Sequence, residues 1–263
     1  MIGYTCKYTP VEIFAGFSEK CVLLSAESEN FEHAQSLTHS NFCSHAKALI
    51  EEIRDKNIKN VVLVNCCDSI RRVYDVLEGG EGFIYLIDMP HDDGDCAVER
   101  LGKELEKLIE VYGNFSGKRF DTSAFLAAFE AEKPLPREKY IGITGARAGE
   151  AFLNAVSGVM PYPTVDMTCS GNRFVKSPGE HEDIHSLMRS YAHALLSQLA
   201  CMRMTDTGTR NKIFADENCR GIIYHTVKFC DYYDFDFKRV SKAAGVPVLK
   251  VETDFTTQSS WQL

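Results

Sequence analysis

Ten cysteines occur among the 263 residues of this sequence, and a cysteine thiol can act as a nucleophile or bind a metal. A reducing cytosol keeps such thiols out of disulfides. A thiol that is simply buried behaves as a small hydrophobic side chain. The position of each cysteine along the chain must therefore decide between packing and metal binding.

One stretch, residues 65–75, combines two cysteines with a change of sequence pattern. It follows an apolar run at residues 61–64 and begins an amphipathic pattern, so Cys67 lies where a buried strand ends and a helix begins. Open α/β sheets bind their ligands at that edge. A helix N-terminus also favours a thiolate. Cys67 is therefore either one reactive thiol or one ligand among several.

Apolar runs and helical periodicity alternate along almost the whole chain. The predicted strands are residues 2–5, 21–25, 61–65, 83–88, 140–144, 164–167, 221–225 and 246–251. The predicted helices are residues 42–54, 69–77, 96–112, 122–131, 146–156, 182–199, 206–215 and 235–244. This alternation is typical of an α/β protein whose parallel sheets are covered by helices on both faces.

A domain boundary is expected within residues 116–139, where the sequence is polar and broken by prolines. Four predicted strands lie on each side of it. We therefore expect two Rossmann-like (flavodoxin-like) domains, residues 1–120 and 121–263. Neither contains a GxxxxGK[ST] or GxGxxG loop, so the chain itself is not expected to bind ATP or NAD. Residues 142–149 are rich in glycine and predict a tight turn into a helix.

The overall charge and hydropathy exclude some kinds of partner. A net charge of −8 argues against general nucleic-acid binding, which requires a basic surface. No apolar run approaches the roughly 18 residues of a membrane span. The first residues also lack the apolar region of a signal peptide. We expect a cytoplasmic protein that contacts neither nucleic acid nor membrane.

Six cysteines map to the edge of the predicted sheets where ligands bind. Cys6, Cys67, Cys169 and Cys230 each follow a predicted strand, Cys43 lies at the start of a predicted helix, and Cys201 ends the long helical segment before residues 202–204. Such positions point to the cleft between two α/β domains. The remaining cysteines, Cys21, Cys66, Cys96 and Cys219, fit less well and are interpreted as packing or surface thiols.

Several converging cysteines could bind a metal. Zinc sites usually contain close pairs such as CxxC, because each half of the site is local in sequence. Here the candidates come one from each loop and lie far apart in sequence. That distribution favours an iron–sulfur cluster in a protected cleft. Zinc and purely structural thiols stay open as alternatives.

Several segments also carry a family resemblance. They are residues 3–12, 41–43, 65–75, 201–204, 228–231 and 245–254. Together they resemble the 2-hydroxyacyl-CoA dehydratase / benzoyl-CoA reductase / double-cubane-cluster protein superfamily. Its most specific patterns here are Cys-Asp-x-x-Arg-Arg, starting at Cys67, and Lys-Phe-Cys-Asp, starting at Lys228.

The resemblance implies two Rossmann-like domains with an iron–sulfur cluster between them and a one-electron function at very low potential. It also implies a separate partner, a dimeric ATPase activator that carries its own [4Fe-4S] cluster and injects the electron. A homodimer of this chain is expected from the same resemblance. Three ligands carry over residue by residue: Cys43, Cys67 and Cys230. Those three are the pattern of dehydratase subunits, which hold a single [4Fe-4S] cluster.

The double-cubane relatives use a larger cysteine set for an [8Fe-9S] cluster. Because Cys6, Cys169 and Cys201 are also present, we expect a double-cubane reductase or electron-transfer protein that acts on a small substrate. Cys66 is the first substitute if one of these extra ligands is wrong. One alternative is the [4Fe-4S] subunit of a 2-hydroxyacyl-CoA dehydratase or aryl-CoA reductase, with an acyl-CoA substrate. Relatives continue past the position of Leu263, so a non-catalytic or zinc-bound relative is a further alternative.

Three other residues receive a role from their positions. His225 ends a predicted strand beside the proposed cleft and could donate a proton to a substrate. The alternative for His225 is a buried histidine with satisfied hydrogen bonds. Asp68 and Asp231 each follow a candidate ligand and are predicted to be helix N-caps.

Overall fold

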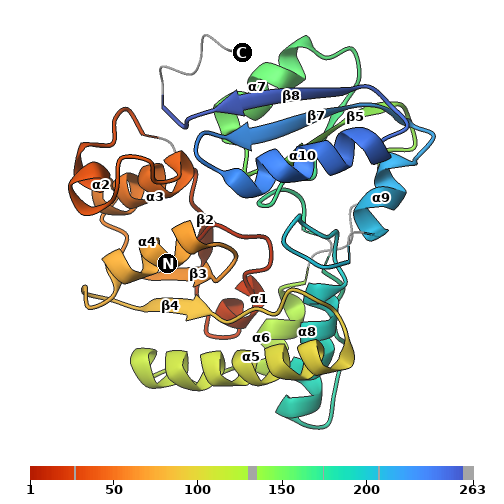
Figure 1. Cartoon of the computed structure of the whole chain (residues 1–263). Coiled ribbons are helices and arrows are strands. Elements are labelled where there is room, and N and C mark those ends of the chain that lie inside the picture. The colour runs from red at the N-terminus through yellow and green to blue at the C-terminus, as the bar shows by residue number, and fades with distance from the viewer. Residues whose placement is uncertain (27, 130–134, 174, 207, 257–263) are drawn as a thin grey trace. The chain divides into compact units, whose positions relative to one another are not determined.

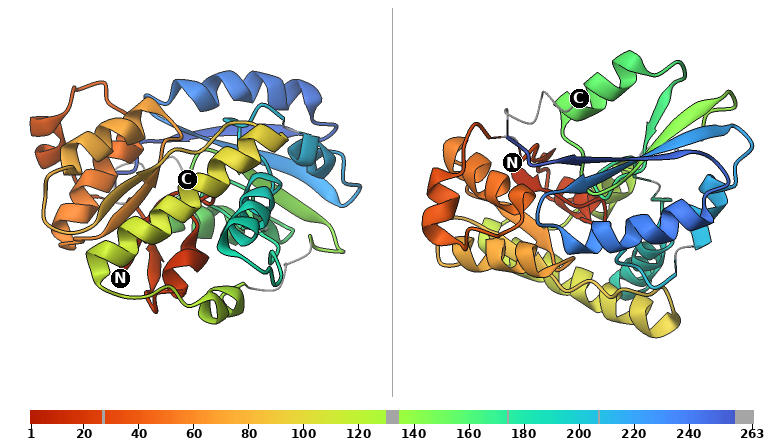
Figure 2. Two further views of the ribbon diagram at one scale, coloured as in Figure 1. Left: turned by 90° about the horizontal axis from the view of Figure 1, so that it is seen from below. Right: turned by 45° about the horizontal axis from the view of Figure 1, so that its top comes forward.

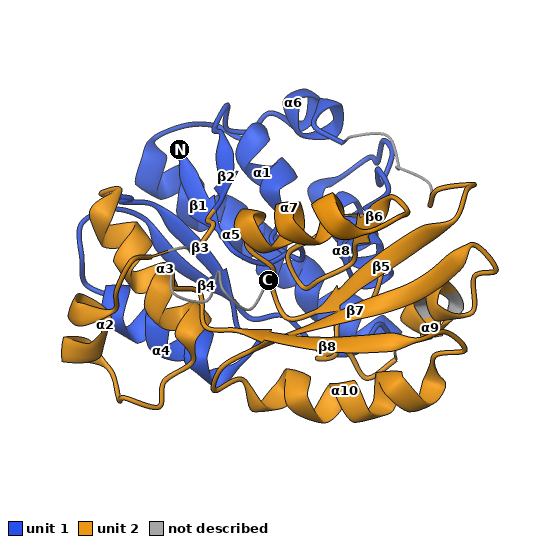
Figure 3. Ribbon diagram, turned by 90° about the horizontal axis from the view of Figure 1, so that it is seen from above, with its two compact units in different colours: residues 1–23, 58–133, 174–198 blue, residues 24–57, 134–173, 199–263 orange. Residues whose placement is uncertain are grey.

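The computed structural model describes residues 1–26, 28–129, 135–173, 175–206 and 208–256 (Figure 1). Contacts divide the chain into two compact units, shown in Figure 3. Unit 1 consists of residues 1–23, 58–133 and 174–198, and unit 2 of residues 24–57, 134–173 and 199–263. None of the described helices is long and apolar enough to cross a membrane.

Unit 1 is built on a parallel sheet with the order β2-β1-β3-β4. The strands are β1 (Ile2–Tyr4), β2 (Cys21–Leu23), β3 (Val61–Val64) and β4 (Ile84–Ile87). All four side chains of β3 are fully buried. A strand buried on both faces is expected to be a continuous apolar run, and the sequence of β3 is Val-Val-Leu-Val.

Unit 2 is built on a second parallel sheet with the order β6-β5-β7-β8. Its strands are β5 (Tyr140–Gly145), β6 (Thr164–Asp166), β7 (Cys219–Val227) and β8 (Val248–Thr253). In both sheets the first strand in sequence lies between the second and the third. This is the flavodoxin-like order, and its ligand-binding point is the carboxyl edge between the first and third strands.

Among the described residues, the helices of unit 1 are α1 (Val11–Ala15), α4 (Asp68–Leu77), α5 (Asp95–Ser116), α6 (Thr122–Ala127) and α8 (Ile184–Leu196). Four of them, α1, α5, α6 and α8, contribute to aromatic contacts, and α4 packs on β3 and β4. The ring of Tyr112 on α5 lies 5.1 Å from that of Phe14 and 4.8 Å from that of Phe83. Helix α5 packs closely against α8 (Figure 2). The distance between them is so short at Gly102 of α5 that an added Cβ atom would lie only 3.2 Å from the Cα of Arg189 on α8.

Unit 2 contains five helices among its described residues: α2 (Glu32–Leu37), α3 (Ser44–Asp55), α7 (Glu150–Val159), α9 (Gly208–Phe214) and α10 (Asp231–Ala243). Two of them, α7 and α10, pack on its sheet. Neighbouring residues of β7 point to opposite faces. The His225 ring lies 4.5 Å from Phe152 of α7, whereas the Tyr224 ring lies 5.5 Å from Phe237 of α10. Helices α7 and α10 therefore lie on opposite faces of the sheet.

The predicted α/β fold class is confirmed: all eight predicted strands exist, and every strand pairing among the described residues is parallel. The predicted strands divide between the two sheets at the expected boundary near residue 120. Two segments group differently, because residues 24–57 belong to unit 2 and residues 174–198 to unit 1. The division into domains 1–120 and 121–263 stays a prediction.

Some helix boundaries differ from the prediction. The short helices α1 and α2 were not predicted, since five or six residues show too little periodicity. Helix α7 begins at Glu150 rather than at residue 146, because residues 146–149 form the tight turn after β5. Helix α10 begins at Asp231 rather than at residue 235. Its buried face includes the charged Asp236, which interrupts the apolar pattern. Predictions for residues 130–131 and 257–263 lie outside the described residues.

Candidate metal centre

Three of the candidate ligands occupy the same local position, the N-cap of a helix. Cys43 precedes α3, Cys67 precedes α4 and Cys230 precedes α10. None of these side chains hydrogen-bonds to the first turn of its own helix. The first N–H groups of a helix have no partner within it and carry partial positive charge. Each of these three thiols therefore lies at a helix end that stabilises a thiolate or another anion.

This arrangement corrects the prediction for two aspartates. Asp68 and Asp231 are the first residues of α4 and α10, and the cysteine before each is the N-cap. The prediction failed because aspartate is a strong N-cap former and cysteine is not. An acidic residue in the first turn still interacts favourably with the helix dipole.

Two of the N-cap cysteines, Cys43 and Cys230, belong to neighbouring segments of unit 2. The backbone N–H of Ser44 donates to the carbonyl oxygen of Lys228 at 3.3 Å, which joins the start of α3 to the loop between β7 and α10. Phe229 in that loop has a left-handed backbone with φ of 64°. The Lys47 ammonium lies 5.8 Å from the centre of the Phe229 ring. Burial lowers the pKa of Lys47, and the negative charge of a Cys43 thiolate opposes that shift.

Two further candidates, Cys169 and Cys201, lie near the phenol of Tyr233 on α10. Burial raises the pKa of Tyr233, and negative charge on Cys169 and Cys201 raises it further. Tyr233 also hydrogen-bonds to the side chain of Cys169. The backbone N–H of Cys169 donates to the carbonyl oxygen of Gly145, the last residue of β5, at 3.3 Å. Unit 2 therefore holds four of the six candidate ligands.

The other two candidates, Cys6 and Cys67, lie in unit 1. They follow β1 and β3, which are adjacent parallel strands, so both lie at the carboxyl edge of that sheet. Asn65 anchors the loop that carries Cys67. Its amide nitrogen donates to Asp88 at 2.5 Å, and its amide oxygen accepts from the backbone N–H of Met89 at 3.1 Å.

Within the part of the chain that the structure describes, no three His, Cys, Asp or Glu side chains form a group that could hold a metal ion. The convergence of Cys6, Cys43, Cys67, Cys169, Cys201 and Cys230 on one cluster therefore stays a prediction. The donor set itself suits an iron–sulfur cluster, since cysteine thiolates are its usual ligands. The three helix N-termini would stabilise the negative charge of such a group.

The cysteines interpreted as packing or surface thiols have other surroundings. Cys219 is buried, and its thiol donates to the carbonyl oxygen of Gly221 at 3.5 Å. Burial raises the pKa of Cys219, which favours the neutral thiol. The Cys21 thiol contacts the carbonyl oxygen of Val11 at 3.8 Å, and Cys96 is exposed on α5.

His225, the candidate proton donor, is fully buried and both of its ring nitrogens have partners. Its Nδ1 lies 3.3 Å from the carbonyl oxygen of Ala146, and its Nε2 lies 2.8 Å from the Thr253 hydroxyl. These contacts fit a neutral ring in which Nδ1 donates and Nε2 accepts. Burial lowers the pKa of His225 to about 4. This geometry fits the alternative, a buried histidine with satisfied hydrogen bonds, and the catalytic role stays a prediction.

The structure adds a polar group that the sequence did not single out. His45, in the first turn of α3, has a buried Nε2 without a hydrogen-bond partner among the described residues. Burial lowers the pKa of His45 to about 3, and the charges of Arg147 and His225 act in the same direction. Arg147 is buried in the turn after β5. The sequence could have singled out Arg147, because it follows a central strand directly and ligand-binding residues often follow such strands.

Comparison with known proteins identifies a family. The family model described as HGD-D, 2-hydroxyglutaryl-CoA dehydratase, D-component, matches residues 6–137 and 146–263. The first matched segment contains Cys6, Cys43 and Cys67, and the second contains Cys169, Cys201 and Cys230. No curated protein matches the chain at a significant level.

Proposed function

The chain belongs to the 2-hydroxyglutaryl-CoA dehydratase D-component family, and we propose that it is the iron–sulfur component of a dehydratase-type enzyme in which Cys43, Cys67 and Cys230 bind the cluster. The observation that carries this proposal is the shared position of these three cysteines at the N-caps of α3, α4 and α10. Thiols that served only for packing would have no reason to share that position.

When bound, such a cluster would supply one electron at low potential to the thioester carbonyl of an acyl-CoA substrate. The chain's own contribution is electrostatic. The N-termini of α3, α4 and α10 stabilise negative charge at the three thiolates. The Lys47 ammonium lies near Cys43 and adds a positive charge at that side chain. The electron would come from a separate ATPase activator, in agreement with the missing nucleotide-binding loops.

A second candidate is the double-cubane cluster, [8Fe-9S], in an electron-transfer protein or reductase. It is favoured by the position of Cys169 and Cys201, which both lie near Tyr233. Cys43 and Cys230 belong to unit 2 as well, whereas Cys6 and Cys67 belong to unit 1. The two candidates differ in iron content, so chemical analysis separates them.

The experiment is iron and acid-labile sulfide analysis of the chain purified without oxygen, followed by EPR of the reduced protein. About four irons per chain support the single cluster, and about eight support the double cubane. Stoichiometric zinc, or a protein free of both metals after reconstitution with iron and sulfide, would contradict both candidates.

The enzymatic part of the proposal has its own test. The loaded chain, supplied with a family activator, ATP and a 2-hydroxyacyl-CoA, should form the unsaturated acyl-CoA, whereas omission of ATP should abolish the product. Absence of acyl-CoA binding by calorimetry would count against a dehydratase role, and it would leave the electron-transfer candidate to be tested with artificial acceptors.

A further inference from the structure

A pocket of about 330 Å³ lies in unit 2, and none of the candidate cysteine ligands lines it. It is formed by helices α9 and α10. Its lining residues are Arg210, Asn211, Arg239, Val240, Lys242 and Ala243. Three of these six residues are basic and none is acidic. The charged residues that line the pocket are therefore all basic, whereas the chain as a whole has a net charge of −8.

Arg210 forms the fixed side of this pocket. Its side chain is buried, and Nη1 and Nη2 each donate to the Asp236 carboxylate at 2.9 Å. The Tyr224 hydroxyl donates to the same carboxylate at 2.6 Å. The third nitrogen of the guanidinium, Nε, is buried and has no hydrogen-bond partner in the described part of the chain. Because Asp236 accepts from both terminal nitrogens and Nε is closed to solvent, Arg210 forms a fixed wall of the pocket and adds no free charge to it.

Arg239 and Lys242 form the exposed side. They lie three residues apart on α10 and therefore share one face of the helix with Ala243. Neither forms an ion pair or a side-chain hydrogen bond within the described residues. The nearby acids on α10 are already engaged, since Asp234 pairs with Lys250 and Asp236 pairs with Arg210. Two positive charges at the pocket are therefore left without a negative partner.

We infer that this pocket binds the phosphate group of a small phosphorylated ligand. Arginine and lysine together are the usual recognition set for phosphate, because guanidinium donors match its oxygens and the ammonium adds a point charge. The volume is at the lower end of the range for small-molecule sites. Asn211 offers a further polar group, and Val240 and Ala243 supply an apolar wall. The inference does not depend on the iron–sulfur cluster or on the dehydratase role.

Calorimetric titration of the full chain with inorganic phosphate, in phosphate-free buffer at low salt, tests the inference. Saturable millimolar or tighter binding is expected. Arg239→Gln and Lys242→Gln should each weaken it several-fold, and the double variant should weaken it at least tenfold. Lys238→Gln is the matched control: it removes the same charge from the adjacent exposed position of α10, outside the pocket, and should leave affinity unchanged.

A parallel titration with adenosine 5′-monophosphate separates two sources of the phosphate group. Tighter binding than that of inorganic phosphate assigns the pocket to a phosphate monoester, and equal binding assigns it to free phosphate. No binding of either probe in the millimolar range would overturn the inference. Equal losses in Lys238→Gln and in the double variant would overturn it as well, because they would indicate attraction by net charge alone.

Discussion

At the residue scale, burial changes the chemistry that each polar side chain can perform. His225 was the candidate proton donor because it ends a strand at the ligand-binding edge. In the structure its ring is enclosed, and Ala146 and Thr253 satisfy both nitrogens. A sequence shows that a histidine ends a strand, but it does not show which neighbours occupy its two nitrogens.

The buried His225 predicts a specific pH dependence of stability. Its pKa falls from 6.5 when exposed to about 4 in the folded chain. Between these two values the unfolded chain binds a proton that the folded chain does not, so stability decreases as pH falls from 6.5 to 4. The full contribution is on the order of 3 kcal/mol.

Replacement of this ring should remove that part of the pH dependence. In His225→Asn the free energy of unfolding, measured in urea, should vary less steeply between pH 7 and pH 4.5 than in the parent chain. His181→Asn is the comparison variant, because it removes an exposed histidine instead of a buried one. An unchanged slope in His225→Asn would show that this histidine titrates in the folded state.

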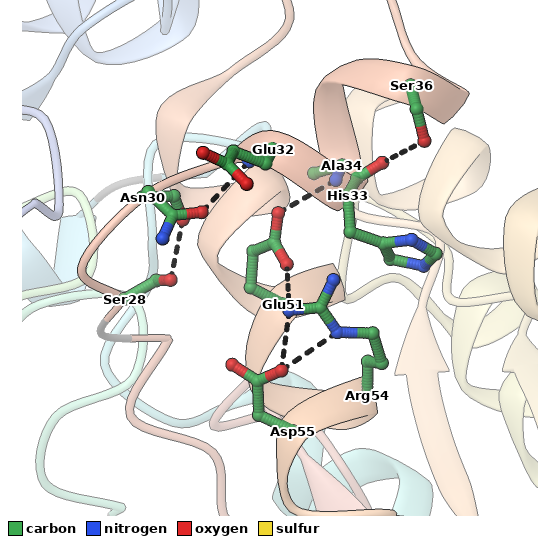
Figure 4. Close-up of polar contacts among 9 residues, drawn as sticks. All are labelled: Ser28, Asn30, Glu32, His33, Ala34, Ser36, Glu51, Arg54 and Asp55. Atoms are coloured by element: carbon green, nitrogen blue, oxygen red, sulfur yellow. Dashed lines mark hydrogen bonds and ion pairs between the residues drawn. The ribbon is translucent and has the colours of Figure 1, made fainter.

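At the element scale, a hydrogen bond joins α2 to α3, as Figure 4 shows. The buried carboxylate of Glu51 on α3 accepts a hydrogen bond from the backbone N–H of Ala34 on α2 at 2.8 Å. The other oxygen of Glu51 lies 2.9 Å from the Arg54 guanidinium, which also pairs with the exposed Asp55. A helix of six residues is too short to be stable alone, so these contacts hold it in place.

Glu51→Ala should therefore loosen α2 and destabilise the chain by about 2 kcal/mol, because a buried N–H loses its acceptor. Hydrogen exchange at residues 32–37 should become faster, and the urea midpoint should fall. Asp55→Ala removes an acid that pairs with the same arginine at the surface, and it should cost less than about 1 kcal/mol. Equal effects of the two substitutions would show that the hydrogen bond to Ala34 does not anchor α2.

Elements with a regular pattern of apolar residues were predicted correctly from the sequence, and elements whose pattern is interrupted were predicted with wrong boundaries. All strands and the long helices were recognisable, because β3 is a continuous apolar run and α5 repeats its buried face over 22 residues. The start of α10 was misplaced because its buried face contains Asp236, whose charge is neutralised by Arg210 from another helix. That partnership brings together residues 26 positions apart, and local periodicity does not reveal it.

At the scale of the whole molecule, the sequence predicted two parallel sheets but not how the helices group with them. Residues 24–57 join unit 2 through contacts such as that between Ser44 and Lys228. Residues 174–198 join unit 1, where α8 approaches α5 at Gly102. Such groupings depend on close packing between distant segments. The same limit applies to the candidate site, since the order of cysteines along the chain does not show which thiols share a metal.

The central claim is that Cys43, Cys67 and Cys230 bind an iron–sulfur cluster. Its most direct test is the iron content of single serine variants after anaerobic reconstitution. Cys43→Ser, Cys67→Ser and Cys230→Ser should each lose most of the iron. Cys66→Ser, which changes the residue next to Cys67, and Cys96→Ser, at an exposed position on α5, should largely keep it. Full iron in any of the first three variants would contradict the account, and so would loss of iron in Cys96→Ser.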